Sequence, residues 1–545
     1  APGGWYYSVR IRSAATVGLK LLNGGRNAPP AVIWVPALFV GAVLLLPLIY
    51  LVVRSFDSGG DIFELLFRER VGVIIGRTIL LVTTVTFASI VLALPLAWLT
   101  TRTDLPFKRA WVVLSALPLV IPSYVAGFIV IAALGPRGML YKALDGPLGI
   151  DSLPDIHGFA GALLTLTFLS FPYVVLTVRA AMLRIDPAME ESSRGLGHGR
   201  WRTFLVVTLP LLRPGIAAGG LLVALYTLSD FGAVSLLHYE TFTWAIFVQY
   251  DSALDRTLGA GLSLVLVVFA LAVIGLEFLG RGRARFYSSS SSAIRPPTIV
   301  PLGRWKWPAV AFCTSIIAFS LVAPMSVLGY WVARGISAGE PFNLVWEAIG
   351  NSIYVAALAA TAAVIAAIPV AALTVRYPSL LSGFLEKLSY IGFALPGIAI
   401  ALALVFFGAR YALPLYQTTG LLLLAYVVLF MSPALGALRT SMLQISPRLE
   451  EAARGLGKSP TRALFTVTLP VVRPGLLAGW ALVFLLVMKE LPATLILSPI
   501  GFTTLATSIW SAASEAFFAR AALPALLLIG ASALPLTFLM LRERR

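Results

Sequence analysis

RAAMLRIDPAMEESSRGLGHGRWRTFLVVTLPLLRPGI, residues 179–216, is a stretch that this chain contains twice. The second copy, residues 439–476, reads RTSMLQISPRLEEAARGLGKSPTRALFTVTLPVVRPGL. The two copies align without a gap at a constant offset of 260 residues, and 19 of the 38 aligned positions are identical. A repeat of this length indicates one supersecondary unit used twice, so we expect a protein built from two homologous halves.

The composition indicates a membrane protein. Hydrophobic residues make up 59% of the chain and charged residues only 12%, whereas soluble domains carry about 25% charged residues. Apolar runs of about 20 residues, enough to cross the hydrocarbon layer as a helix, recur along the whole sequence. Because backbone groups cannot stay unpaired in lipid, we predict an all-α fold. Twelve transmembrane helices are expected near residues 31–53, 74–99, 110–133, 159–180, 214–237, 258–280, 309–332, 350–375, 388–408, 419–438, 474–498 and 521–541.

The distribution of basic residues predicts the orientation. With the N-terminus in the cytoplasm, the tails and inner connections hold 30 of the 41 basic residues and 9 of the 24 acidic ones. An excess of Lys and Arg marks the cytoplasmic side of a bacterial plasma (inner) membrane protein. We therefore expect both termini in the cytoplasm. The net charge of +17 is attributed to this signal and to contact with anionic membrane lipid, not to nucleic acid.

The repeat and the composition divide the chain into two halves around a seam. Residues 281–307 are rich in Ser, Pro and Arg and are expected to form a cytoplasmic linker. We expect a basic cytoplasmic tail at 1–30, a first half at 31–280, a second half at 308–541 and a cytoplasmic C-terminus at 542–545. Six helices per half is an even number, so the two six-helix repeats are predicted to be parallel.

A second repeated block shows where the halves differ. Residues 77–102 match residues 351–376 at an offset of 274, so the first half has 14 extra residues between the two matched blocks. The outer loop 135–158 is the expected place for them. We hypothesise that this loop gives the outer face the asymmetry needed to receive a single extracellular partner. Unchanged docking of that partner after deletion of the loop would contradict this hypothesis.

The repeated stretch predicts a short helix outside the membrane in each half. Asp186 and Ser446 are suited to cap its N-terminus, and a proline follows each of them. Paired glutamates then lie near the positive end of the helix dipole. Gly197 and Gly457 can adopt the left-handed conformation that ends a helix. Each helix is expected to be a rod of about 15 Å.

These residues carry a resemblance to a known family. Glu191-Ser-Ser-x-x-x-Gly197 before Val207-Thr-Leu-Pro210, and Glu451-Ala-Ala-x-x-x-Gly457 before Val467-Thr-Leu-Pro470, resemble the E-A-A loop of ABC-importer permeases. The first copy has Ser-Ser in place of Ala-Ala, a small-for-small change that we expect to keep the helix surface. The resemblance implies the type I ABC importer permease fold, in which this loop forms a coupling helix that inserts into the ATPase subunit. The ATPase-coupling residues implied by it are Glu190, Glu191, Arg194, Gly197, Glu450, Glu451, Arg454 and Gly457.

The chain itself carries no nucleotide motif. Gly457-Lys458-Ser459 imitates the end of a phosphate-binding loop, but the required first glycine is replaced by Ala452. We therefore expect no catalytic residues, no enzymatic activity and no cofactor in this chain. ATP and Mg would be used by two copies of a separate ABC ATPase subunit. Cys313 and the three histidines, which are scattered in loops, show no metal-ligand spacing, so no metal site is assigned.

Two acids lie at matching places after the repeated stretch. Asp230 and Glu490 each follow the Pro-Gly turn by about 15 residues, or roughly 22 Å of helix. A charge at membrane depth usually faces protein or a polar pathway. The substrate-pathway candidates are therefore Asp230, Glu490 and the adjacent Lys489. The alternative is a carboxylate at a helix end, paired with Lys489 or a backbone amide.

The substrate is indicated by resemblance alone. The segments 229–237 and 488–510 resemble the fused, two-half permeases of ferric-iron importers, and this similarity covers residues 35 to 540. Carboxylate oxygens suit a hard cation such as Fe(III). Permeases for thiamine, polyamine, sulfate and phosphonate share the fold and remain alternatives. The resemblance also implies a periplasmic or lipid-anchored substrate-binding protein as a partner.

A different class, an ion-coupled secondary transporter, requires several ionisable residues near the middle of the membrane. The apolar runs are largely uncharged apart from the acids above, which argues against it. An intramembrane enzyme would need a constellation of His, Asp and Glu residues, and none is evident in the sequence.

Overall fold

The computed structural model describes residues 29–56, 68–149, 151–251, 256–280, 299–340 and 343–542. Over these residues the chain is almost entirely helical, and they contain no β-sheet, only one isolated bridge between Thr103 and Val300. The predicted all-α fold is confirmed. The predicted linker and both predicted tails lie wholly or largely outside the described residues.

The first half contains the following helices. They are α2 (Ala31–Phe56), α4 (Glu69–Arg102), α5 (Lys108–Leu114), α6 (Ser123–Leu134), α7 (Met139–Leu148), α8 (Phe159–Met182), α9 (Pro187–Gly195), α10 (Arg200–Thr203), α11 (Leu209–Ser229), α12 (Gly232–Leu236), α13 (Phe242–Asp251) and α14 (Arg256–Gly280). Two shorter segments are the 3₁₀ turn η1 (Leu117–Val120) and the π-helical turn η2 (Phe204–Thr208).

The second half repeats much of this order. Its helices are α15 (Lys306–Ile317), α16 (Ala323–Ser337), α17 (Asn343–Arg376), α18 (Leu380–Ala394), α19 (Gly397–Tyr411), α20 (Thr419–Leu443), α21 (Pro447–Gly455), α22 (Pro460–Ala463), α23 (Leu469–Val471), α24 (Arg473–Met488), α25 (Pro492–Leu497), α26 (Leu505–Ser514) and α27 (Phe518–Arg542). The short turns are η3 (Gly303–Trp305), η4 (Ala318–Val322), η5 (Leu413–Leu415) and η6 (Leu464–Thr468).

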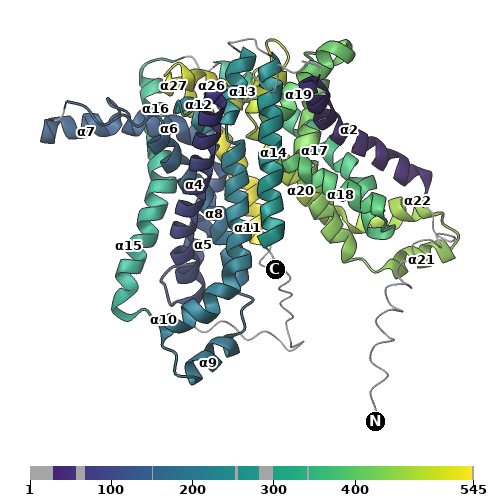
Figure 1. The fold of residues 1–545 in the computed structure, drawn as a ribbon, viewed down its shortest axis with the longest axis horizontal. Helices are drawn as coiled ribbons and strands as arrows, with labels where there is room; N and C mark the ends of the chain where they lie inside the picture. Colours follow the sequence, from purple (N-terminus) through teal and green to yellow (C-terminus); the bar gives the residue numbers. More distant parts are fainter. Residues whose placement is uncertain are drawn as a thin grey trace. The chain divides into compact units, whose positions relative to one another are not determined.

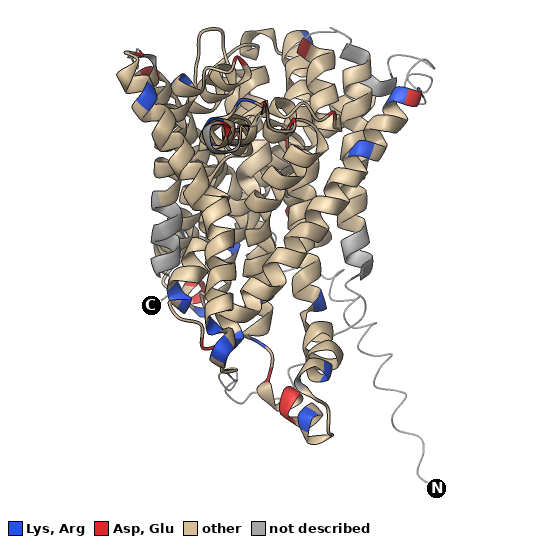
Figure 2. Ribbon diagram, turned by 90° about the vertical axis from the view of Figure 1, so that its left-hand side faces the viewer, with Lys and Arg blue, Asp and Glu red and all other residues tan. Residues whose placement is uncertain are grey.

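Within the described residues, nine helices are long and apolar enough to cross a membrane, and eleven if each bent pair counts as one span. A further apolar helix, Phe518–Ala533, is shorter. The prediction of exactly twelve spans is therefore not confirmed. Figure 2 shows that the long helices carry few charged residues along their lengths and that Lys, Arg, Asp and Glu gather near helix ends and connections. This distribution is expected of helices surrounded by lipid.

Several of the predicted spans are interrupted. The predicted span 110–133 is divided into α5, η1 and α6, and 388–408 is divided at Pro396 between α18 and α19. Proline has no N–H to continue the helical hydrogen bonds, which accounts for breaks at Pro122 and Pro396. The predicted spans 214–237 and 474–498 end early, at Ser229 and Met488, because the chain leaves helical geometry at the two acids that follow.

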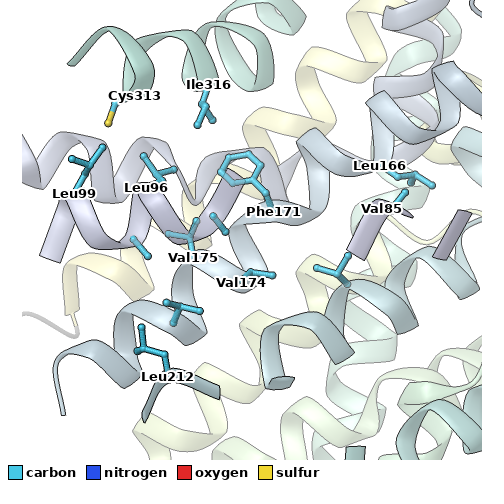
Figure 3. Close-up of a cluster of buried hydrophobic side chains, with 14 of the residues drawn as sticks. Val85, Leu96, Leu99, Leu166, Phe171, Val174, Val175, Leu212, Cys313 and Ile316 are labelled. Carbon is cyan, nitrogen blue, oxygen red and sulfur yellow. The ribbon is translucent and has the colours of Figure 1, made fainter. Parts of the chain in front are cut away.

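The described chain packs as two compact units, and each is considered by itself. The larger unit contains Ile49–Tyr354, Ala394–Leu422 and the chain from Met488 onward. In it α4, α8 and α11 pack side by side (Figure 1). Figure 3 shows their core, with Leu96, Phe171 and Val175 close together. Cys313 and Ile316 of α15 join the same core. The first helix of the second half therefore packs against the first half.

The smaller unit contains α2 up to Leu48, together with Val355–Phe393 and Leu423–Val487. Here Gly41 of α2 lies directly against Leu385 of α18, since a Cβ at Gly41 would overlap the Leu385 side chain. The first helix of the first half therefore packs against helices of the second half. The first helix of each half therefore packs against helices of the other half, and the sequence repeat does not predict this exchange.

Equivalent glycines allow a close helix contact in each half. A Cβ on Gly219 of α11 would lie 2.7 Å from Cα of Val174 on α8, and one on Gly479 of α24 would lie 3.0 Å from Cα of Ala434 on α20. The two glycines are repeat equivalents at the offset of 260. Small residues that let backbones approach are a common device of membrane helices.

We expect Gly219→Ala to destabilise the protein by about 1–3 kcal/mol, because α8 and α11 must separate to admit the methyl group. Gly479→Ala should cost less, since its neighbouring atom is farther away. Gly76→Ala on α4 is the matched control, because a Cβ there meets no atom within 4 Å. Thermal unfolding in detergent measures the effect. Equal midpoints for Gly219→Ala and Gly76→Ala would contradict the expectation.

Candidate functional site

The repeated stretch forms the two short helices with the expected capping chemistry. The Asp186 side chain accepts a hydrogen bond from the Ala188 amide at 3.0 Å, and Ser446 accepts one from the Arg448 amide at 3.4 Å. The helices end at Gly195 and Gly455, and two residues later Gly197 and Gly457 have φ values of 86° and 85°. The predicted caps and left-handed glycines are confirmed. At nine residues each, the helices are about 14 Å long.

Each of these helices presents the same exposed surface. Leu196 is 80% exposed and Leu456 is 85% exposed, and Met189 and Leu449 are exposed at the other end of the helix. Between them lie the exposed residues Glu191 and Arg194 in α9, with Glu451 and Arg454 at the same positions in α21. Each helix therefore offers two apolar side chains flanking an acid and a base.

The first glutamate of each pair, Glu190 or Glu450, points toward the rest of the protein and away from this exposed surface. Glu190 is buried, accepts a hydrogen bond from the Thr208 hydroxyl at 2.9 Å and lies 3.6 Å from Nη2 of Arg102. In the second half, Glu450 accepts hydrogen bonds from Thr468 at 2.7 Å and from Nε of Arg376 at 2.9 Å. The two paired glutamates of each copy thus have different positions, one inward and one outward.

Four residues of the site are not among those predicted from the sequence: Arg102, Arg376, Thr208 and Thr468. A signal for them was present, because the second repeated block ends in Arg102 and Arg376, and both threonines stand in the Val-Thr-Leu-Pro match. Each threonine belongs to a π-helical turn, η2 or η6, at the same position of the repeat. π-Helical turns inside helices often occur at functional sites.

One of the two serines that replace Ala-Ala in the first copy is buried. Ser193 is buried, and its hydroxyl lies 3.1 Å from Nδ1 of His198 and 3.3 Å from the Thr203 hydroxyl. Its equivalent Ala453 is also buried. Ser192 alone of the two serines is exposed. Of the two serines, only Ser192 can therefore alter the exposed surface of the helix. The change at Ser193 lies inside the protein.

The two acids of the predicted pathway make equivalent contacts. Asp230 is buried, and its Oδ1 accepts hydrogen bonds from the amides of Ala233 at 3.1 Å and Val234 at 3.3 Å, at the start of α12. Glu490 accepts one from the amide of Ala493 at 3.2 Å, at the start of α25. Both carboxylates therefore cap a short helix, which matches the alternative of a carboxylate bound to backbone amides.

Lys489 has a different partner from the one considered in the sequence. Its ammonium group donates a hydrogen bond to the Leu119 carbonyl at 3.0 Å, in the 3₁₀ turn that interrupts the third predicted span. The first half has Ser229 at the equivalent position, so this cation has no counterpart in the repeat. Lys489 thus joins the two halves inside the larger unit.

Aromatic side chains make a second junction between the halves in the same unit. The Phe231 ring, which is buried, lies 6.0 Å from Trp510 and 4.9 Å from Phe247 between ring centroids. The Trp510 indole nitrogen donates to the Ser235 hydroxyl at 3.3 Å. The residues after Asp230 therefore pack against α26 of the second half.

Histidines that looked scattered in the sequence include one close pair. The rings of His157 and His238 lie 5.4 Å apart, and His157 contacts the Asp155 carboxylate. Among the described residues no group of three or more His, Cys, Asp or Glu side chains could hold a metal ion. The pair therefore does not change the assignment of metal sites.

The fold and site together define a class. The long apolar helices occur in two repeats, and each repeat has a capped helix at the same point, so the chain is a multi-pass membrane protein with two homologous halves. The family comparison makes this specific. The model of the binding-protein-dependent transport system inner membrane component matches residues 89–285 and again residues 359–542. The chain belongs to this family, and the family domain occurs in it twice. It is a permease subunit and not an enzyme.

Similarity to individual proteins extends over nearly the whole chain. The Fe(3+)-transport system permease protein FbpB 2 of Haemophilus influenzae is 35% identical over 94% of this chain and 98% of its own length. The ferric transport system permease protein FbpB of Actinobacillus pleuropneumoniae is 24% identical over 89% of this chain and 74% of its own length. The molybdenum transport system permease protein ModB of Escherichia coli is 37% identical, but over only 25% of this chain.

Proposed function

We propose that this chain is the permease subunit of an ATP-driven importer that carries ferric iron across the bacterial inner membrane. The observation that carries the class is the duplicated, capped helix with its exposed surface. The cargo is supported by the 35% identity to a ferric permease over both halves. The similarity to a molybdenum permease covers a single region and supports the shared fold more than a shared cargo.

The proposal assigns α9 and α21 to coupling. Two copies of a separate ABC ATPase would bind, one at each helix, and the ATP and Mg would be used there. The exposed leucines would enter an apolar cleft of the ATPase, while Glu191, Arg194 and their counterparts would pair with charged groups at its rim. Apolar anchors surrounded by polar contacts are the usual composition of a tight interface.

The orientation follows from the same assignment. If α9 and α21 meet an ATPase, they lie in the cytoplasm, and both termini lie there too, as the basic residues predict. A periplasmic or lipid-anchored binding protein would deliver the cargo to the opposite face. The extra loop of the first half, which contains α7, is the proposed asymmetric element of that face.

The path for the cargo would run between the halves. Closure of the ATPases on ATP would draw α9 and α21 together and open the path outward, and hydrolysis would reset it. Asp230, Glu490 and Lys489 would act on the path through the segments they hold in place, because their contacts with Ala233, Ala493 and Leu119 are structural.

Uptake into proteoliposomes tests the cargo. We expect vesicles that contain the permease, the ATPase and the binding protein to take up radioactive Fe(III) only when ATP is present on the side of the membrane where the ATPase lies. Thiamine, polyamine, sulfate, phosphonate and molybdate should not compete at equal concentration. Efficient competition by one of these would transfer the assignment to that cargo. Uptake driven by an ion gradient without the ATPase would support a secondary transporter instead.

A further inference from the structure

The two clusters formed by Arg102, Glu190 and Thr208, and by Arg376, Glu450 and Thr468, have no role in the proposed interface with the ATPase. We propose that they are positioning clusters, which fix α9 and α21 to the ends of α4 and α17 so that a displacement of each short helix moves the transmembrane helix. The inference rests on the proposed function of α9 and α21 as coupling elements.

The two clusters have the same composition and connect equivalent elements. In each cluster one carboxylate joins three elements: the last residue of a 34-residue helix, the short capped helix and a π-helical turn. The glutamates and the threonines are related by the offset of 260 and the arginines by the offset of 274. The same three residue types therefore meet in two separate parts of the chain, although the arginine uses Nη2 in the first cluster and Nε in the second.

The arginines of both clusters are largely shielded from solvent. The Arg102 side chain is 3% exposed and the Arg376 side chain is 14% exposed. Neither Nε nor Nη1 of Arg102 has a hydrogen-bond partner in the described part of the chain. Its Nη2 contacts Glu190 and the Met182 carbonyl, at 3.6 and 3.3 Å. A buried cation that loses its anion is left with an uncompensated charge, so each pair is sensitive to the removal of one member.

The two glutamates of each pair face in different directions. Glu191 and Glu451 face outward and are available to a partner, while Glu190 and Glu450 are turned to the bundle. The inward glutamate is thus unavailable for docking in this structure. Its contacts instead fix the orientation in which the outward surface is presented, and they reach the last residue of a 34-residue helix.

The test uses the full complex of permease, ATPase and binding protein. We expect the double variant Glu190→Gln, Glu450→Gln to keep its association with the ATPase within about twofold, while cargo moved per ATP hydrolysed falls about tenfold. Hydrogen exchange of the α9 and α21 amides should become about tenfold faster, because the helices are no longer held. Faster exchange with unchanged transport per ATP would contradict the inference, and so would unchanged exchange.

The neighbouring glutamates provide the matched comparison. Glu191→Gln with Glu451→Gln makes the same chemical change one residue away, and it should weaken association with the ATPase and leave the exchange of α9 and α21 unchanged. If it leaves association unchanged, the proposed coupling function fails and the inference fails with it. If association weakens while the inward variants behave as the wild type, only the positioning role is wrong.

A double-mutant cycle covers the case in which the inward variants fold poorly. Arg376→Gln and Glu450→Gln each leave one partly buried charge unpaired, whereas the combined variant removes both charges. We expect the combined variant to transport better per ATP than either single variant. Thr468→Val, which removes only the hydroxyl contact, should reduce transport per ATP in the same direction by about threefold. If the losses of transport per ATP in the two single variants simply add in the combined variant, the contact between Arg376 and Glu450 is not their cause.

Discussion

Replacing Leu196 and Leu456 together by aspartate is expected to abolish assembly with the ATPase and, with it, ATP-driven uptake. Both leucines are more than three-quarters exposed, and each directly follows the last residue of its short helix. A buried apolar anchor at an interface contributes about 2 kcal/mol or more, so its loss weakens binding about thirtyfold at each helix. An aspartate placed in an apolar cleft adds a desolvation cost to this loss.

Co-purification with the ATPase and uptake into proteoliposomes measure the effect. Each single variant should retain partial assembly through the other helix. Leu413→Asp is the matched control, because Leu413 is also an exposed leucine, 67% exposed, but belongs to η5 and not to a coupling helix. Folding is compared by thermal unfolding of the permease alone. Normal ATPase assembly of the double variant would exclude α9 and α21 as the docking elements.

Local chemistry explains why these helices were predictable. Each helix is capped by a residue next to it, Asp186 or Ser446, and is followed by a left-handed glycine, Gly197 or Gly457. The structure has these caps and left-handed residues at the predicted positions. No distant contact is needed to form a capped helix of two to three turns. The repeat then doubled the signal, since each copy could be compared with the other.

Long-range packing could not be predicted in the same way. The contacts between Glu190 and Arg102 join residues 88 positions apart, and nothing in their local patterns states that one glutamate of a pair faces inward. The partners of α2 and α15 could not be predicted either, because both helices are largely apolar and an apolar composition does not specify which helix they pack against. Breaks inside apolar runs, such as those at Ser229 and Met488, were missed because hydropathy does not distinguish a straight span from a capped turn.

Removing the carboxylates of Asp230 and Glu490 is expected to have the second large effect, and the choice of replacement decides between two roles. Asp230→Ala leaves the Ala233 and Val234 amides without their acceptor in a buried place, and we expect a loss of about 2 kcal/mol in stability. Glu490→Ala should act in the same direction through the Ala493 amide. The combined alanine variant should transport cargo poorly, because both short helices lose their caps.

Asp230→Asn and Glu490→Gln keep an acceptor oxygen but remove the charge. If the acids act as caps, these variants should stay close to the wild type in thermal unfolding and in uptake. If instead the negative charge attracts a cationic cargo, uptake should fall as far in Asp230→Asn as in Asp230→Ala while stability is preserved. Parallel measurement of unfolding midpoints and initial uptake rates therefore separates the two roles. The hydrogen bonds of both carboxylates to backbone amides lead us to expect the first result.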